Sequence, residues 1–151
     1  MTQGKSCQES EILKIGVPKE PENENRVAIV PSSMKKLAKA GFEVLIEKGA
    51  GVLANYNDSD YEAAGAILAD REAVMSCPNI IAINFPGVEG ISEGTNLVCV
   101  ADPFRNPENV KQCMKGNITL MSMDMIPRRL SRAQSMDVNS SQDSLSGYKA
   151  V

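Results

Sequence analysis

Ile80-Ile81-Ala82-Ile83 and Leu97-Val98-Cys99-Val100 are two short apolar runs near the middle of the chain. Runs that lack polar alternation are typical of strands buried on both faces, as in a parallel sheet. Similar apolar segments lie on both sides of this pair, and stretches with helical spacing of apolar residues separate most of them. Strands that alternate with helices predict an α/β fold with a doubly wound parallel sheet.

The other element boundaries follow from apolar runs and from helix punctuation. Pro31 begins and Gly41 follows a helical pattern, Asp70 precedes another, and Asp58 or Ser59 is expected to cap a short helix. The remaining strands are predicted at residues 12–17, 42–47, 66–69 and 118–122, and the helices at 31–40, 59–64, 71–75, 106–116 and 140–151.

Composition limits the classes of function that the chain can have. Its 151 residues fit one domain, and no apolar run approaches the roughly 20 residues that span a bilayer. The net charge of −3 and the absence of tryptophan argue against nucleic acid as a partner. Residues 1–11 are polar and are predicted to form a disordered lead-in without a signal peptide.

The chain contains no histidine, which removes the commonest general base and the commonest metal ligand. Its four cysteines show no C-x-x-C spacing, so neither a metal site nor a disulfide framework is expected. Cys77 and Cys99 lie in apolar surroundings and are predicted to be core residues. Catalysis would therefore depend on carboxylates, lysines or a cofactor.

A polar stretch, residues 127–141, follows the last predicted strand. Ligands in doubly wound sheets bind beyond the carboxyl ends of the strands, where this stretch would lie together with Lys19 and Arg26. Its guanidinium, amide, carboxylate and hydroxyl groups suit a phosphorylated, amide-bearing ligand such as a nicotinamide dinucleotide. A solvated basic turn is the alternative interpretation.

Gly49-Ala50-Gly51-Val52-Leu53-Ala54 fits the spacing of a dinucleotide-binding fingerprint, and Asp70 lies about twenty residues further on. A pyrophosphate site needs a helix that opens directly at the glycines, whereas residues 55–60 have the composition of a loop. We therefore predict that the glycines form a tight turn and that Asp70 caps a helix.

Several motifs resemble the family of alanine dehydrogenases and nicotinamide nucleotide transhydrogenases, over residues 12–151. The blocks shared with the whole family are Ile15–Glu20, Asn25–Ala28, Pro31, Gly41–Val44, Glu47–Gly51 and Tyr61–Ala66. The blocks that resemble the NAD-binding alpha component of proton-translocating transhydrogenases are Asn106–Glu108, Met123-Asp124 with Pro127-Arg128, Ser131–Asp137, Ser140-Ser141 and Gly147–Val151.

This resemblance implies that the polar stretch reaches the nicotinamide end of bound NAD. The implied cofactor-binding residues are Arg129, Gln134, Asp137 and Ser140, and Gln134 is the one placed closest to the chemistry. Arg129 can hold a ribose or phosphate oxygen, and an amide or hydroxyl can pair with a ribose or carboxamide. The resemblance further implies that hydride would move directly between two nicotinamide rings, so that the task of the protein would be to hold and orient them.

The resemblance also implies a domain plan and partners. Residues 12–126 would form the outer lobe and residues 127–151 the nicotinamide-side loop and the start of a linking helix. A nucleotide-binding domain and a final segment returning to this lobe would lie beyond residue 151, so that the lone chain is inactive. The implied assembly is a homodimer with NADP-binding and membrane components, peripheral to a membrane in the bacterial cytoplasm or on the mitochondrial matrix side.

Two other functions remain open at this point. A substrate lobe like that of alanine dehydrogenase is favoured by Arg26 and Lys19, which could bind a carboxylate. It is opposed by Asn84 and Asp102, which stand where the resemblance places the lysine and the histidine of alanine dehydrogenases. Arg26 could equally be a structural ion-pair residue. The third possibility is an inactive regulatory or assembly lobe.

Overall fold

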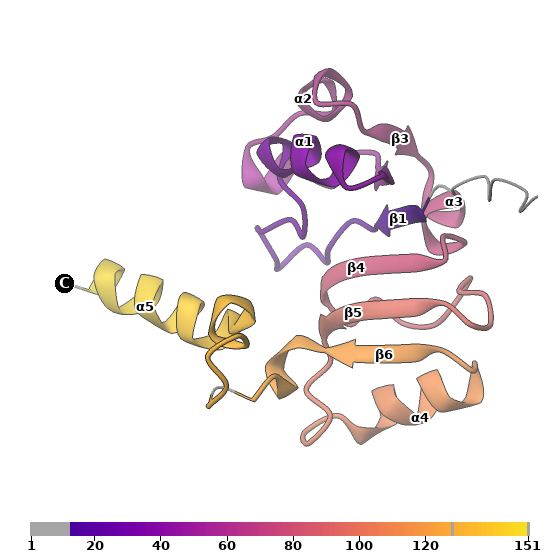
Figure 1. Ribbon diagram of the computed structural model, residues 1–151. Coiled ribbons are helices and arrows are strands. Elements are labelled where there is room, and N and C mark those ends of the chain that lie inside the picture. The colour runs from indigo at the N-terminus through magenta and orange to yellow at the C-terminus, as the bar shows by residue number, and fades with distance from the viewer. Residues whose placement is uncertain (1–12, 128, 151) are drawn as a thin grey trace, which may run out of the picture.

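The computed structural model describes residues 13–127 and 129–150, where six parallel strands form one sheet in the order β3-β2-β1-β4-β5-β6 (Figure 1). The strands are β1 (Leu13–Val17), β2 (Phe42–Glu47), β3 (Ile67–Ala69), β4 (Asn79–Asn84), β5 (Asn96–Val100) and β6 (Thr119–Ser122). The helices are α1 (Pro31–Lys39), α2 (Asp58–Ala63), α3 (Arg71–Met75), α4 (Pro107–Lys115) and α5 (Val138–Ala150), with 3₁₀ turns η1 (Val52–Ala54), η2 (Met123–Met125) and η3 (Gln134–Met136). The predicted α/β fold with a doubly wound parallel sheet is confirmed.

Different helices cover the two faces of the sheet. Ile15 and Val17 of β1 pack in one core cluster with Met34 of α1. Gly16 points to the opposite face, where an added Cβ atom would lie 2.2 Å from the carbonyl oxygen of Val74 in α3. Because side chains alternate along a strand, α1 and α3 must lie on opposite sides of the sheet.

A second core cluster lies on the α3 face, around β4 and β5. Ile80, Leu97 and Cys99 are fully buried there and pack with Cys113 of α4. Burial raises the pKa of the Cys99 thiol to about 12, so this side chain stays an uncharged core residue. Cys77 is also buried and free, which confirms that Cys77 and Cys99 are core residues.

The residues that begin and end α1 are those expected, whereas α2 begins one residue earlier than predicted. Pro31 is the first residue of α1, and Gly41 follows it with φ 87°, a conformation that glycine adopts readily. The cap of α2 is Asn57, whose N–H donates to the Asp60 carboxylate at 2.8 Å. Asp58 is instead drawn into the helix, and its carboxylate accepts from Gly49.

The last helix, α5, starts at Val138 and extends away from the sheet on the side of the carboxyl ends (Figure 1). Its residues from Ser140 to Ala150 are exposed, including Leu145 and Tyr148. None of the helices in residues 13–127 and 129–150 has the length and apolar character that crossing a membrane requires. The predicted lead-in, residues 1–11, lies outside the described residues, as do Ile12, Arg128 and Val151.

Candidate functional site

The strand order creates a topological switch point between β1 and β4. From β1 the chain proceeds to β2 and β3 on one side of the sheet, and from β4 to β5 and β6 on the other. In open parallel sheets, ligands bind beyond the carboxyl ends of the strands at such a point. Two pockets lie there, and residues of the loop after β1 and of β4 line both of them.

The larger pocket, here called the Arg26 pocket, has a volume of about 690 Å³. Half-buried apolar residues of β4 and β5, Ile81, Ile83, Val98 and Val100, line it. Its other lining residues are Asn25, Arg26, Val27, Ala28, Val30, Ala54, Ala82, Asn84, Met123, Val138, Asn139 and Gln142. An apolar surface with amide and guanidinium groups beside it can hold and orient a flat, partly apolar ligand.

Glu20 fastens the loop after β1 to the end of β4. Its carboxylate accepts hydrogen bonds from the backbone N–H groups of Ile83 at 2.5 Å and Asn84 at 3.1 Å, and from the Asn84 side chain at 3.1 Å. Glu20 is 7% exposed, and these three donors compensate for the burial of its charge. The position of the loop at the switch point is therefore set by contacts within the chain.

Glu24 and Arg26 form a two-pronged ion pair beside the Arg26 pocket. Arg26 Nε donates to Glu24 Oε1 at 2.8 Å, and Nη2 donates to Oε2 at 2.6 Å. The remaining terminal nitrogen, Nη1, donates to Gln142 Oε1 on α5 at 2.9 Å. The guanidinium group of Arg26 is therefore bonded to the chain itself on both sides.

The pair with Arg26 keeps Glu24 charged under all ordinary conditions. The hydrogen bond from the guanidinium group is the main reason why the pKa of Glu24 falls to about 2, and partial burial of the carboxyl opposes this shift. The same pairing raises the pKa of Arg26. Both partners thus carry full charge at neutral pH, and the hydrogen bonds between them are charge-assisted.

The residues that the sequence suggested as cofactor-binding lie on the segment 129–140, of which Val138 and Asn139 line this pocket. Arg129, Gln134 and Ser140 are exposed, and Asp137 is partly buried immediately before α5. Asp137 Oδ1 accepts from the Ser140 N–H at 3.0 Å, which is the bond that a helix cap makes to the first turn. None of the four lines the pocket, but the helix that Asp137 caps does so through its first turns.

Sequence reasoning missed Val138 and Gln142 as pocket residues. They are four residues apart on α5, so they lie on the same face of this helix. The helix was expected to begin at Ser140, and with that start Val138 would not have been part of it. The sequence signal for Gln142 is its spacing of four residues from Val138, which places both side chains on one face of a helix.

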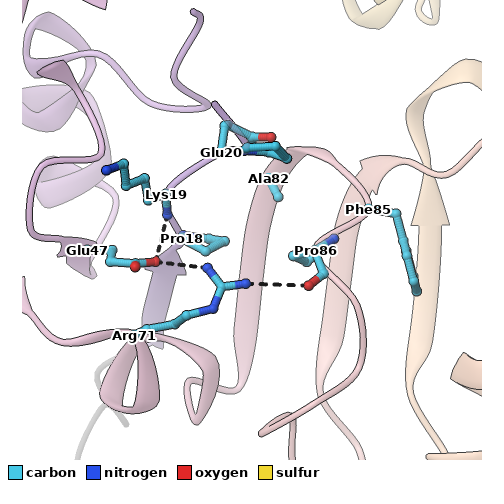
Figure 2. A pocket seen from close by; sticks show the side chains of 9 residues that line it. Pro18, Lys19, Glu20, Glu47, Arg71, Ala82, Phe85 and Pro86 are labelled. Carbon is cyan, nitrogen blue, oxygen red and sulfur yellow. Dashed lines mark hydrogen bonds and ion pairs between the residues drawn. The ribbon is translucent and has the colours of Figure 1, made fainter. Parts of the chain in front are cut away.

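The smaller pocket, here called the Glu47 pocket, has a volume of about 280 Å³ and contains Lys19 (Figure 2). The Glu47 carboxylate accepts a hydrogen bond from the backbone N–H of Lys19 at 2.7 Å and another from Arg71 Nη1 at 3.1 Å. Arg71 Nη2 also donates to the Pro86 carbonyl at 3.5 Å. Figure 2 shows the Lys19 side chain extending away from the Arg71 guanidinium. Lys19 lines this pocket and Arg26 lines the larger one, so the two residues belong to different pockets.

Asn84 and Asp102 both have structural partners. The Asn84 side chain donates to Glu20 at 3.1 Å and to Glu24 at 3.4 Å, so it joins the two glutamates of the loop after β1. Asp102 has φ 44° and lies 3.8 Å from Arg105. Neither contact provides a proton-transfer group in the Arg26 pocket.

The glycine-rich string after β2 forms a tight turn, as predicted. Gly49 has φ 75°, and its N–H donates to the Asp58 carboxylate at 2.9 Å. A Cβ atom on Gly51 would lie 2.6 Å from the ring of Tyr61. The string continues as the 3₁₀ turn η1, so no α-helix opens at these glycines to receive a pyrophosphate.

The chemistry of this site is that of holding and orienting. Within the described parts of the chain, no group of three or more histidine, cysteine, aspartate or glutamate side chains could hold a metal ion. The buried carboxylate of Glu20 is fully engaged by three donors. The apolar wall and polar rim of the Arg26 pocket can hold a flat, partly apolar group, whereas the turn at Gly49 offers no helix N-terminus for a pyrophosphate.

Comparisons with known proteins identify the family of the chain. Residues 16–146 match the family described as "Alanine dehydrogenase/PNT, N-terminal domain". A Rhodospirillum rubrum protein, named as the first part of NAD(P) transhydrogenase subunit alpha, is 41% identical over 150 residues, which include 92% of this chain and 39% of that protein. The "NAD(P) transhydrogenase subunit alpha" of Haemophilus influenzae is 38% identical over 143 residues, which include 92% of this chain and 28% of that protein.

Two solved structures share the fold. The transhydrogenase from Sinorhizobium meliloti superposes with a TM-score of 0.86 at 35% identity, over 91% of this chain and 42% of that one. An L-alanine dehydrogenase superposes with a TM-score of 0.73 at 29% identity, over 80% of this chain and 34% of that one. The chain thus spans less than half the length of the relatives that it matches.

Proposed function

Because the chain belongs to the alanine dehydrogenase/PNT N-terminal domain family, we propose that it forms the outer lobe of an NAD(H)-binding transhydrogenase component. The observation that carries the proposal is the position of the segment from Gln134 to Ser140. It lies at the carboxyl edge of the sheet, where α5 contributes Val138, Asn139 and Gln142 to the Arg26 pocket. The named relatives, two transhydrogenase alpha subunits and a transhydrogenase, support the same assignment.

In this proposal the chain supplies one side of a coenzyme cleft. Arg129 and Gln134 are exposed and free to reach a ribose, phosphate or carboxamide, while Ser140 sits in the first turn of α5. Asp137 holds that turn by its bond to the Ser140 N–H. When bound, the nicotinamide groups of NADH and NADP supply the hydride chemistry, and the residues of this chain contribute binding and orientation.

The proposal extends to the rest of the assembly. The Rhodospirillum rubrum relative is named as only the first portion of its alpha subunit, which implies further components. We assign NADP binding and proton translocation to such components. A homodimer peripheral to the membrane, in the bacterial cytoplasm or on the matrix side of mitochondria, is the expected setting. Residues 12–126 would be the lobe proper, with residues 127–151 leading to the nucleotide-binding domain.

The test replaces Gln134 by alanine in the complete assembly and measures transhydrogenation. Gln134→Ala is expected to slow hydride transfer about 10- to 100-fold, because small misplacements of reacting groups are that costly. Its control is Gln112→Ala on α4, which should retain the wild-type rate. An unchanged rate in Gln134→Ala, and also in Arg129→Ala, would contradict the proposal.

One observation favours a second candidate, oxidoreduction of an amino or oxo acid. Arg26 lines the pocket and could clamp a carboxylate. Its bonds to Glu24 and Gln142 oppose this role, because they already engage three of its five N–H groups. Pyruvate-dependent oxidation of NADH by the full-length protein would establish this activity, and its absence would remove it.

A further inference from the structure

Arg26 connects two parts of the molecule that are far apart in sequence. The loop after β1 carries Glu24 and Arg26, and α5 carries Gln142, which is 116 residues further along the chain. The bond between Arg26 Nη1 and Gln142 Oε1 is 2.9 Å long. It joins the loop at the switch point to the helix that follows the segment from Gln134 to Ser140.

The loop end of this connection is rigid. Glu24 holds Arg26 by two side-chain bonds and also accepts from the Arg26 backbone N–H at 2.9 Å. Asn84 donates to both Glu24 and the buried Glu20. The guanidinium group is thus anchored, through carboxylates and an amide, to the carboxyl end of a central strand.

The helix end of the connection is weakly supported by packing. The side chains of α5 from Ser140 onward are exposed, and Leu145 and Tyr148 retain 58% and 84% of their accessible surface. A helix with so little buried apolar surface is held in place mainly by contacts in its first turns. Val138, Asn139 and Gln142 provide such contacts at the pocket.

We propose that Arg26 is a positioning residue, which bridges the loop after β1 to α5 and fixes the segment from Gln134 to Ser140 beside the Arg26 pocket. This inference rests on the proposed function, in which that segment contacts the coenzyme. It also assigns Arg26 to orientation of the coenzyme site, in place of a clamp for a carboxylate substrate. Gln142 is its partner in this role.

The first test measures amide hydrogen exchange in the full-length protein within its assembly. Arg26→Ala and Gln142→Ala should each accelerate exchange in residues 134–142 by about 5- to 10-fold, as expected for loss of one solvent-exposed hydrogen bond. Gln142 is exposed, so its substitution should leave the fold intact even if Arg26→Ala does not fold. The control is Arg105→Ala, which removes a guanidinium group that pairs with Asp102 and should leave exchange in residues 134–142 unchanged. Unchanged exchange in Gln142→Ala would overturn the inference.

The second test is a double-mutant cycle on the kinetics with NADH. Arg26→Ala and Gln142→Ala should each raise KM for NADH about threefold or more with a smaller effect on kcat, and the double variant should be no worse than Arg26→Ala. Gln142→Glu should raise KM less than Gln142→Ala does, because a carboxylate can accept the same bond from Arg26. Additive effects of the two alanine substitutions would show that Arg26 acts on the ligand directly, and would refute the bridge.

The two proposals fail in different ways. Hydrogen exchange reports the bridge without any need for activity. Faster exchange in Arg26→Ala, combined with normal hydride transfer in both Gln134→Ala and Arg129→Ala, would uphold the bridge and refute the coenzyme role of the segment. Unaltered exchange, combined with slow hydride transfer in Gln134→Ala, would refute the bridge and uphold the coenzyme role of the segment.

Discussion

Arg26 lines a pocket, but most of its donors are already bonded within the chain. Glu24 and Gln142 accept from three of its five N–H groups, and the side chain remains 49% exposed. From sequence, a ligand clamp and a structural ion pair were equally open interpretations, since the partners of an arginine are set by the tertiary structure. The bond to Gln142 could not be inferred from local pattern, because the two residues meet only when the loop and α5 converge on one edge of the sheet.

The Glu24–Arg26 pair should make stability depend on pH in a specific window. The pKa of Glu24 is lowered from 4.5 to about 2, so the folded state favours the charged carboxylate. Its contribution to stability is complete above pH 4.5 and is lost as the pH falls toward 2. Urea unfolding of the wild type and of Glu24→Gln should therefore differ most above pH 4.5 and converge near pH 2.

The matched control for this measurement is Glu22→Gln, at an exposed position in the same loop. It should differ little from the wild type across the range. A difference between wild type and Glu24→Gln that stays constant from pH 6 to pH 2 would contradict the role of the Glu24 charge.

Among the elements, those with a strong local signal were well predicted. The strand Phe42–Glu47 and the helix Arg71–Met75 have the predicted bounds. Asp70 occupies the N-cap position of this helix as predicted, but its side chain makes no cap bond and pairs with Lys48 instead. α5 starts two residues before its predicted position. Asp137 caps this helix through a side-chain bond, but the serine-rich sequence that follows makes the cap difficult to recognise from sequence. Because the predicted start of α5 was wrong, the sequence did not predict that Gln142 lines the Arg26 pocket.

The contact between β1 and α3 yields a prediction about Gly16. A Cβ atom there would lie 2.2 Å from the Val74 carbonyl oxygen and 3.1 Å from Cys77 Cβ, so Gly16→Ala must push α3 away from the sheet. The expected cost is about 1–3 kcal/mol of unfolding free energy, the usual range for overpacking. Urea unfolding followed by circular dichroism measures it.

Gly147→Ala on α5 is the matched control, because an added Cβ atom there meets nothing within 4 Å. Alanine is a better helix former than glycine, by up to about 1 kcal/mol, so this variant should be as stable as the wild type or slightly more so. Equal stability of Gly16→Ala and wild type would show that α3 can move away without cost.

For the whole molecule, the alternation of strands and helices was enough to predict the doubly wound parallel sheet. The pockets were only partly predictable, because the sequence indicated the edge of the sheet but not which loops would meet there. The rejection of the glycine string as a pyrophosphate site depended on its flanking residues, and the turn at Gly49 bears out that argument.

The lone 151-residue chain should bind NADH weakly or not at all. The Gly49 N–H is already bonded to Asp58, and the string continues as a 3₁₀ turn, so backbone donors for a pyrophosphate are missing at that place. Calorimetric titration of the isolated chain with NADH is expected to show no saturable heat at micromolar coenzyme. Tight binding would mean that another region of this lobe cradles the phosphates.

The two core clusters have a consequence for biosynthesis. The first draws its buried residues from positions 15–66 and the second from positions 75–118. A nascent polypeptide can therefore bury the first cluster while the second is still inside the ribosome. Until residues 79–84 emerge, one edge of β1 has no neighbour and could pair with a strand of another chain. Slow translation between these two halves should thus promote aggregation more than slow translation after residue 118.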